Sequence, residues 1–170
     1  MKFEFSAGGI VYKHEAPLNE NARRTTKNIV VLVAQHSQHH GWVFPKGLID
    51  KTKSKVKSQK SKVIRETKEE AALREVKEET GISGKIIKPL IPVTYWYAFQ
   101  GEKIKKTVYY FLMEYVSGDI KDHDFEMENV EWLPMDEVEK RLTYKSDKEV
   151  WKEAKGKIRN SNIEIRNKSK

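Results

Sequence analysis

The chain has 170 residues and a formal net charge of +8, and charged residues make up 34% of it. This length fits one domain with a single core. Cysteine is absent, which excludes disulfides, thiolate catalysis and cysteine-ligated zinc. The longest strongly apolar run, residues 29–34, is far shorter than the ~20 residues that a membrane span needs. The first residues also lack the pattern of a secretion signal, so we expect a cytoplasmic protein without membrane contact.

Strand patterns dominate the first third of the chain. Residues 3–13 predict a strand that is interrupted at Gly8 and Gly9, and residues 14–28 predict a polar loop. The continuous apolar run at residues 29–34 is typical of a buried strand. Residues 42–47 predict a short strand that ends at Pro-Lys-Gly. The next segment, residues 51–63, contains six lysines and no acid, so the basic character of the chain is mostly local.

A helix is predicted over residues 68–80. Thr67 and Glu70 have the spacing of a capping box at its start, and Gly81 suits the position just after its end. Its apolar stripe would be formed by Ala72, Leu73 and Val76.

The second half of the chain returns to strands and then ends in helices. Strands are predicted over residues 86–99, 105–116 and 130–133, with an acidic loop at residues 117–128. Helices are predicted over residues 136–142 and 147–158. We expect one domain, residues 1–158, followed by a polar tail, residues 159–170. This order of elements predicts an α/β fold with a mixed sheet and helices on both faces.

Three glutamates of the predicted helix, Glu75, Glu78 and Glu79, lie three and four residues apart and therefore share one face. Carboxylates packed together repel each other unless a cation lies between them. Magnesium and manganese prefer oxygen ligands and would fill that role. The ordinary alternative is a solvated acidic face, with nearby basic side chains as surface partners.

Residues 74–82 resemble the end of the Nudix box, which reads Arg-Glu-apolar-any-Glu-Glu-any-Gly-apolar. Glu66 lies eight residues before Arg74, as the box requires. The stretch Phe-Pro-Lys-Gly that ends at Gly47 resembles the approach to the box glycine, although 18 residues separate it from Glu66 instead of five. The difference suggests a lysine-rich insertion at about residues 51–63. The resemblance covers about residues 3–158 and implies a Nudix-type α/β/α sandwich with a mixed central β-sheet.

The resemblance also implies roles for individual residues. Glu75, Glu78 and Glu79 match the family's metal ligands, for Mg²⁺ with Mn²⁺ as the alternative, and any of them could double as the base that activates water. Arg74 would hold a glutamate in place, and Glu66 would brace the loop of the box. Further metal contacts are implied for the carbonyl of Gly47 and for one acid outside the box, Glu126, with Glu128 as its competitor.

Candidate substrate residues are basic or aromatic. A phosphate-binding lysine would be Lys46, Lys105 or Lys106, although each could be an ordinary solvated lysine. Aromatic faces bind nucleobases, but such rings also pack in cores. A turn histidine, His39 or His40, could line the substrate cleft. The ring candidates for base stacking are Tyr95, Tyr97, Tyr109 and Tyr144.

Within the family, the chain resembles diadenosine tetraphosphate hydrolases, which split their substrate asymmetrically into ATP and AMP. RNA 5′-pyrophosphohydrolase and nucleoside triphosphate pyrophosphatase activities stay open, as does a non-catalytic module that binds nucleotide or RNA. The alternating lysines between Lys51 and Lys62 predict contact with RNA or polyphosphate, because lysines that neutralise phosphates give salt-dependent affinity. A solubilising loop is the plainer interpretation of the same residues.

Overall fold

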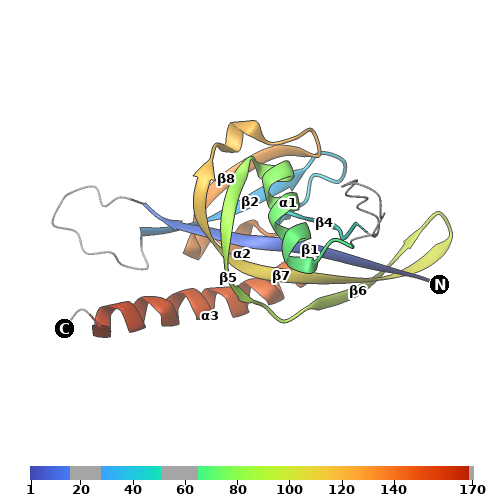
Figure 1. Ribbon diagram of the computed structural model, residues 1–170. Helices are drawn as coiled ribbons and strands as arrows, with labels where there is room; N and C mark the ends of the chain where they lie inside the picture. Colours follow the sequence, from blue (N-terminus) through green and yellow to red (C-terminus); the bar gives the residue numbers. More distant parts are fainter. Residues whose placement is uncertain (16–27, 51–64, 169–170) are drawn as a thin grey trace, which may run out of the picture.

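The computed structural model describes residues 1–15, 28–50 and 65–168, and side chains up to residue 161 (Figure 1). In these residues, eight strands form one sheet. The helices are α1 (Lys68–Thr80), α2 (Met135–Arg141) and α3 (Lys145–Lys168), with a short 3₁₀ helix, η2 (Ile120–Asp122). The strands are β1 (Lys2–His14), β2 (Ile29–His36), β3 (Trp42–Val43), β4 (Lys46–Leu48), β5 (Ile82–Pro89), β6 (Val93–Phe99), β7 (Glu102–Gly118) and β8 (Met127–Pro134).

The centre of the sheet is the parallel pair β1 and β7, and the other pairings are antiparallel. One edge of β1 pairs first with β4 and then with β2. Strand β7 likewise pairs with β6 over its first part and with β5 over its second. The sheet is therefore mixed, as predicted.

The predicted interruption of the first strand is wrong, because β1 is continuous through both glycines and changes partner there. A side chain on Gly8 would collide with the carbonyl of Pro45, and the N–H of Gly9 donates to that same oxygen at 3.2 Å. The glycines thus let the chain before β4 lie directly against β1. This contact brings β4 to the centre of the molecule.

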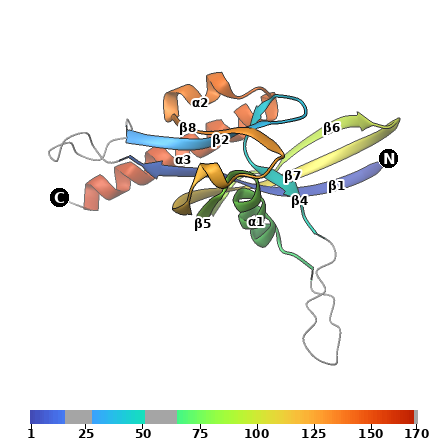
Figure 2. The same ribbon diagram turned by 90° about the horizontal axis from the view of Figure 1, so that it is seen from above.

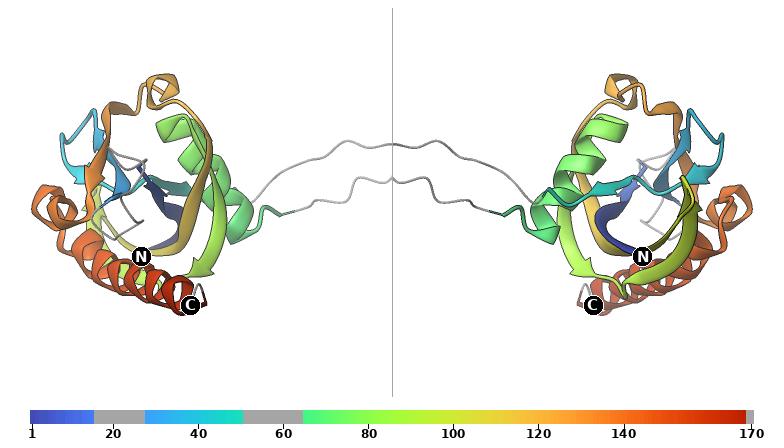
Figure 3. Two further views of the ribbon diagram at one scale, coloured as in Figure 1. Left: turned by 90° about the vertical axis from the view of Figure 1, so that its left-hand side faces the viewer. Right: turned by 90° about the vertical axis from the view of Figure 1, so that its right-hand side faces the viewer.

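Helices cover both faces of the sheet, which confirms the predicted sandwich (Figures 2 and 3). Helix α1 packs on one face, where Ala72 and Val76 join a buried cluster with Met113 of β7. Helices α2 and α3 pack on the other face, where Trp151 and Phe44 belong to a second buried cluster. The functional elements α1 and β4 therefore rest on a core that is packed from two sides.

The predicted bounds of α1 are confirmed, and so are its caps. The Thr67 hydroxyl accepts from the N–H of Glu70 at 3.1 Å, and the Glu70 carboxylate accepts from the N–H of Thr67 at 3.0 Å. Gly81 has a φ of 75°, which explains why glycine ends the helix. The apolar stripe differs at one position, since Leu73 is exposed and Ala71 is buried instead.

One further prediction needs correction, and others concern residues that the structure does not describe. Helix α3 continues to Lys168, so the predicted end at residue 158 is wrong and the polar tail is largely helical. Most of the predicted loop at residues 14–28 and the whole lysine-rich segment at residues 51–63 fall outside the described residues. Among the described helices, none is long and apolar enough to cross a membrane.

Candidate active site

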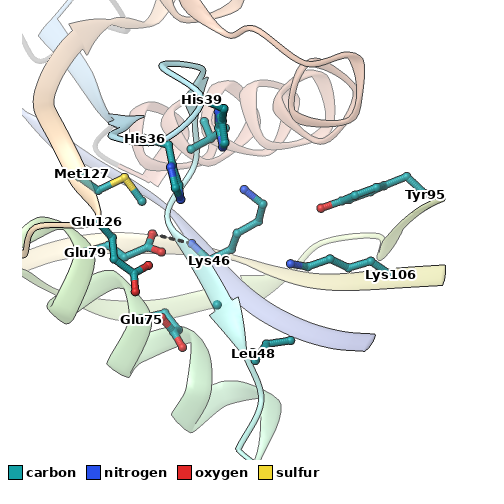
Figure 4. Close-up of a pocket in the computed structure, with 12 residues that line it drawn as sticks. His36, His39, Lys46, Leu48, Glu75, Glu79, Tyr95, Lys106, Glu126 and Met127 are labelled. Atoms are coloured by element: carbon teal, nitrogen blue, oxygen red, sulfur yellow. Dashed lines mark hydrogen bonds between the residues drawn. The ribbon is translucent and has the colours of Figure 1, made fainter. Parts of the chain in front are cut away.

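A cavity of about 450 Å³ lies between α1, β4, the β6–β7 hairpin and the start of β8. Figure 4 shows three carboxylates on one side of it and two lysine amines with a tyrosine on the other. Acids and bases from distant parts of the sequence thus face one space. The lining residues are His36, His39, Val43, Lys46, Gly47, Leu48, Glu75, Glu79, Tyr95, Lys106, Glu126 and Met127.

Glu79 is the most buried of the three carboxylates, with 4% of the residue exposed. Its oxygen accepts from the N–H of Lys46 at 3.0 Å. Burial raises the pKa of Glu79 to about 8, against the opposing effect of the Lys46 amine. A desolvated carboxylate is unfavourable unless a cation or hydrogen bonds compensate it. The pKa of Glu75 is also raised, first by burial, and Glu126 adds to both shifts. The carboxylate oxygens of these buried acids are the kind of ligand that Mg²⁺ and Mn²⁺ prefer.

Gly47 lies directly against the carboxylate of Glu75. A Cβ at this position would collide with the carboxylate of Glu75. A side chain here would therefore displace that carboxylate, and glycine leaves it in its place beside β4. The result is that the backbone of β4 lies directly beside the acids of the helix.

Arg74 ties the helix to the loop after β4. Its Nε and Nη2 donate to the two carboxylate oxygens of Glu66 at 2.8 and 3.0 Å, and Nη2 also donates to the Leu48 carbonyl at 3.1 Å. The side chain of Glu66 is fully buried and accepts from the N–H of Asp50 at 2.8 Å. The hydrogen bonds to Glu66, followed by those to the other carboxylates, raise the pKa of Arg74. Glu66 thus lies in the bracing position that the resemblance implies.

Glu78 differs from its two neighbours on the helix. It does not line the cavity, its side chain is 53% exposed, and it accepts from Arg74 Nη1 at 3.0 Å. The same nitrogen donates to Glu75 at 2.6 Å. In the part of the chain that the structure describes, no three acidic or histidine side chains gather closely enough to hold a metal ion together. The guanidinium of Arg74 lies between Glu75 and Glu78, two of the predicted ligands.

The loop before β8 distinguishes the two candidates for the additional acid. Glu126 lines the cavity, and its carbonyl accepts from the N–H of Ser37 at 2.8 Å, which ties the loop to the end of β2. Glu128 instead contacts the Nδ1 atom of His40 at 2.9 Å. This geometry favours Glu126 over Glu128 as the additional acid for metal binding.

Alternation along β6 and β7 separates the predicted substrate residues. Lys106 and Tyr95 are register partners and both line the cavity, and burial lowers the pKa of Lys106. Lys105 points to the opposite face, where its Nζ lies 5.4 Å from the ring centroid of Trp96. Tyr109 also faces away from the cavity, beneath the amine of Lys68 at 4.5 Å. Neither Lys105 nor Tyr109 is brought to the cavity, because successive side chains of a strand point to opposite faces.

Two other tyrosines lie near the cavity without lining it. Tyr97 is on the same face as Tyr95 but farther along the hairpin, and its hydroxyl donates to Glu4 at 2.7 Å. The hydroxyl of Tyr144 lies 3.0 Å from the Nδ1 atom of His39, which does line the cavity. Burial is the main cause that lowers the pKa of His39. Lys46 also lines the cavity, as predicted for a phosphate contact.

Four lining residues were not predicted from the sequence: His36, Val43, Leu48 and Met127. The ring of His36 stacks on that of His39, with centroids 4.2 Å apart. A register shift between Gln35 and His36 ends the regular pairing of β2 with β8 there. No local sequence pattern predicts such a register shift. Apolar residues that line a cavity also cannot be told from core residues by their sequence pattern.

The chain is similar to known proteins in sequence and in fold. The family model of the NUDIX domain matches residues 16–154. MutT4 of Mycobacterium tuberculosis is 36% identical over 107 residues, which is 63% of this chain and 38% of that protein. The 8-oxo-(d)GTP phosphatase of Mycolicibacterium smegmatis is 29% identical over 149 residues, which is 88% of this chain and 41% of that protein. The chain therefore spans about two fifths of the length of these relatives.

Solved structures share the fold at low identity. An Ap4A hydrolase of C. elegans, in a binary complex, matches with a TM-score of 0.58 and 18% identity, over 91% of this chain and 97% of that one. The dihydroneopterin triphosphate pyrophosphohydrolase of E. coli matches with a TM-score of 0.61 and 17% identity, over 90% and 97% of the two chains. Because the family model covers most of the sequence, the chain belongs to the Nudix family.

Proposed function

We propose that this protein hydrolyses a phosphoanhydride bond of a nucleotide, with Mg²⁺ or Mn²⁺ held at the acidic side of the cavity. The observation that carries the proposal is the opposition of Glu75, Glu79 and Glu126 to Lys46 and Lys106 across one space. A polyphosphate chain carries closely spaced negative charges, which amines and a metal can neutralise together. A cavity of this volume is in the range of small-ligand sites.

The residues divide the chemistry between them. The amines of Lys46 and Lys106 bind and orient phosphate oxygens. A metal held by Glu75, Glu79 and Glu126 would neutralise developing charge and lower the pKa of the attacking water. The water oxygen forms a bond to phosphorus, and the bond from phosphorus to the bridging oxygen breaks. The proton of the water passes to a carboxylate of the cavity wall, and the leaving group departs as a phosphate anion. Glu78 reaches this group of ligands only if Arg74 releases it.

For the substrate, we propose diadenosine tetraphosphate, which would be split into ATP and AMP. Tyr95 lies opposite the acids, and the paired rings of His39 and Tyr144 lie at the edge of the cavity, so aromatic surfaces are available for an adenine. A nucleoside triphosphate is the second candidate, because a relative matched over 88% of this chain is named for an 8-oxo-(d)GTP phosphatase.

The experiment is a substrate panel with Mg²⁺ or Mn²⁺. It contains diadenosine tetraphosphate, GTP, 8-oxo-GTP, ADP-ribose and 5′-triphosphorylated RNA, with products separated by chromatography. Glu79→Gln and Glu78→Gln test the acids, and Glu69→Gln is the matched control, because Glu69 is exposed on the same helix and does not line the cavity. We expect the first two variants to lose at least 100-fold in turnover and the control to keep it. Equal turnover by Glu79→Gln would refute the proposed chemistry.

Contact of the lysines between Lys51 and Lys62 with RNA or polyphosphate stays a prediction, since these residues lie outside the described part. Replacing residues 51–63 with a neutral linker tests it. We expect the salt dependence of triphosphorylated RNA turnover to become weaker while turnover of mononucleotides is unchanged. An unchanged salt dependence would contradict this prediction.

A further inference from the structure

The face of the β6–β7 hairpin that points away from the cavity carries a row of side chains with alternating chemistry. Phe3 of β1, Lys105 of β7 and Trp96 of β6 are direct register partners on three adjacent strands. Neighbouring strands lie about 4.8 Å apart, so these side chains stand next to one another. The next row on the same face contains Phe5, with Thr107 and Thr94 as its register partners.

The aromatic rings of this face are open to solvent. The exposed fractions are 48% for Phe3, 40% for Phe5 and 48% for Trp96. Two amines lie over the largest ring in cation–π contacts, with Lys103 Nζ and Lys105 Nζ at 4.8 and 5.4 Å from the centroid of Trp96. Figure 1 shows the hairpin and the start of β1 extending beyond α1, which covers this face only farther along β7.

We propose that this face, the aromatic platform formed by Phe3, Phe5, Trp96, Lys103 and Lys105, binds single-stranded nucleic acid. Exposed rings stack unpaired bases regardless of their identity, and lysines beside them contact the connecting phosphates. At the described register positions of this face on β1, β6 and β7, from Phe3 to Phe5, from Thr94 to Ala98 and from Lys103 to Thr107, no acid occurs. The platform is therefore positive as well as aromatic.

The same arrangement argues against other partners. Lys105 stands between the rings of Phe3 and Trp96, so that inserting both rings into a lipid bilayer would also bury its ammonium group. A protein partner would bury the lysines at the centre of its interface, where lysine is depleted. A nucleic-acid duplex keeps its bases stacked internally and offers no free base to the rings. Unpaired bases with their phosphates match both kinds of side chain.

The platform can be tested separately from hydrolysis. The probe is a fluorescein-labelled 12-nucleotide RNA with a 5′-hydroxyl end, which has no polyphosphate for the cavity, and EDTA is present throughout. Fluorescence anisotropy of the full chain measures the dissociation constant. We expect Trp96→Ala and Phe3→Ala each to weaken binding about tenfold, and Trp96→Phe to keep most of the affinity. Phe125→Ala is the matched control, because Phe125 is 89% exposed and lies outside the platform.

Charge and specificity give further readouts. Lys103→Ala should lower the slope of log affinity against log salt by about 0.7, the value for one phosphate contact on a single strand. A duplex of the same length should bind more weakly than the single strand. Unchanged affinity in the Phe3→Ala, Trp96→Ala double variant would overturn the proposal, because binding would then come from other lysines. An equal loss of RNA affinity in Phe125→Ala would also overturn it. The same holds if the platform binds anionic vesicles, or a second copy of the chain, more tightly than it binds RNA.

Discussion

Substitution of the buried acid by its uncharged analogue, Glu79→Gln, should stabilise the metal-free protein. The amide oxygen of glutamine can still accept from the N–H of Lys46, so the hydrogen bond is kept while the charge is removed. Burial raises the pKa of Glu79 from 4.5 to about 8. Between these two values the folded protein keeps a proton that the unfolded chain releases, and the stability of the wild type therefore falls as pH rises.

The size of the effect follows from the same two values. Each pKa unit corresponds to about 1.36 kcal/mol, so the wild type loses roughly 3 kcal/mol of stability between pH 4.5 and pH 7 through this group. Glutamine does not titrate and loses nothing. In EDTA, the variant should therefore be more stable than the wild type by roughly 3 kcal/mol at pH 7 and about equal to it near pH 4.5. The raised pKa of Glu75 affects both proteins and cancels in this difference.

Urea denaturation in EDTA at both pH values measures this difference. Glu69→Gln, exposed on the same helix, should show no comparable gain. Addition of Mg²⁺ should then stabilise the wild type more than Glu79→Gln, because binding to the folded state adds to its stability. A variant that is less stable than the wild type at pH 7, or one whose gain is the same at both pH values, would refute the reasoning.

The remaining predictions concern the residues around this acid. Arg74→Lys should lower the free energy of unfolding by roughly 2 kcal/mol, because a lysine cannot replace the two hydrogen bonds that arginine donates to buried Glu66. Urea denaturation measures this loss. The control is Arg141→Lys, at a partly exposed ion pair, which should change the free energy of unfolding by less than about 1 kcal/mol. Gly47→Ala should abolish turnover while circular dichroism still reports a folded protein. Lys106→Met should raise the KM for a nucleotide about tenfold or more, and Lys85→Met, at an exposed lysine, should leave it unchanged in steady-state assays.

Helix α1 could be predicted from the sequence because its signals are local. The capping box, the closing glycine and the spacing of the acids all lie within 15 residues, and each depends on backbone geometry that neighbours in the sequence determine. The helix ends therefore matched the prediction at both residues. The end of α3 did not, because the polar composition after residue 158 indicates exposure, and exposed residues can be helical or irregular.

The faces of the strands could not be predicted in the same way. Lys105 and Lys106 are chemically identical neighbours in β7, and only the register with β1 and β6 decides that the second lines the cavity. Glu78 and Glu79 pose the same difficulty on the helix. Their positions differ by about 100° around its axis, and the packing of α1 against β4 buries one and exposes the other. Such differences arise from contacts between segments far apart in the chain.

The pairing of Asp50 with Glu66 has a consequence for how this enzyme family can change. The N–H of Asp50 donates to the Glu66 carboxylate at 2.8 Å, and the N–H of Glu66 lies 3.4 Å from the Asp50 carbonyl. Asp50 and Glu66 are thus held together at one point, which Arg74 anchors from the helix. Since doubling a loop adds only about 0.6 kcal/mol of closure entropy, this point can accept inserts of different length and chemistry. We therefore expect changes of length between Asp50 and Glu66 to leave the carboxylates of the cavity in place.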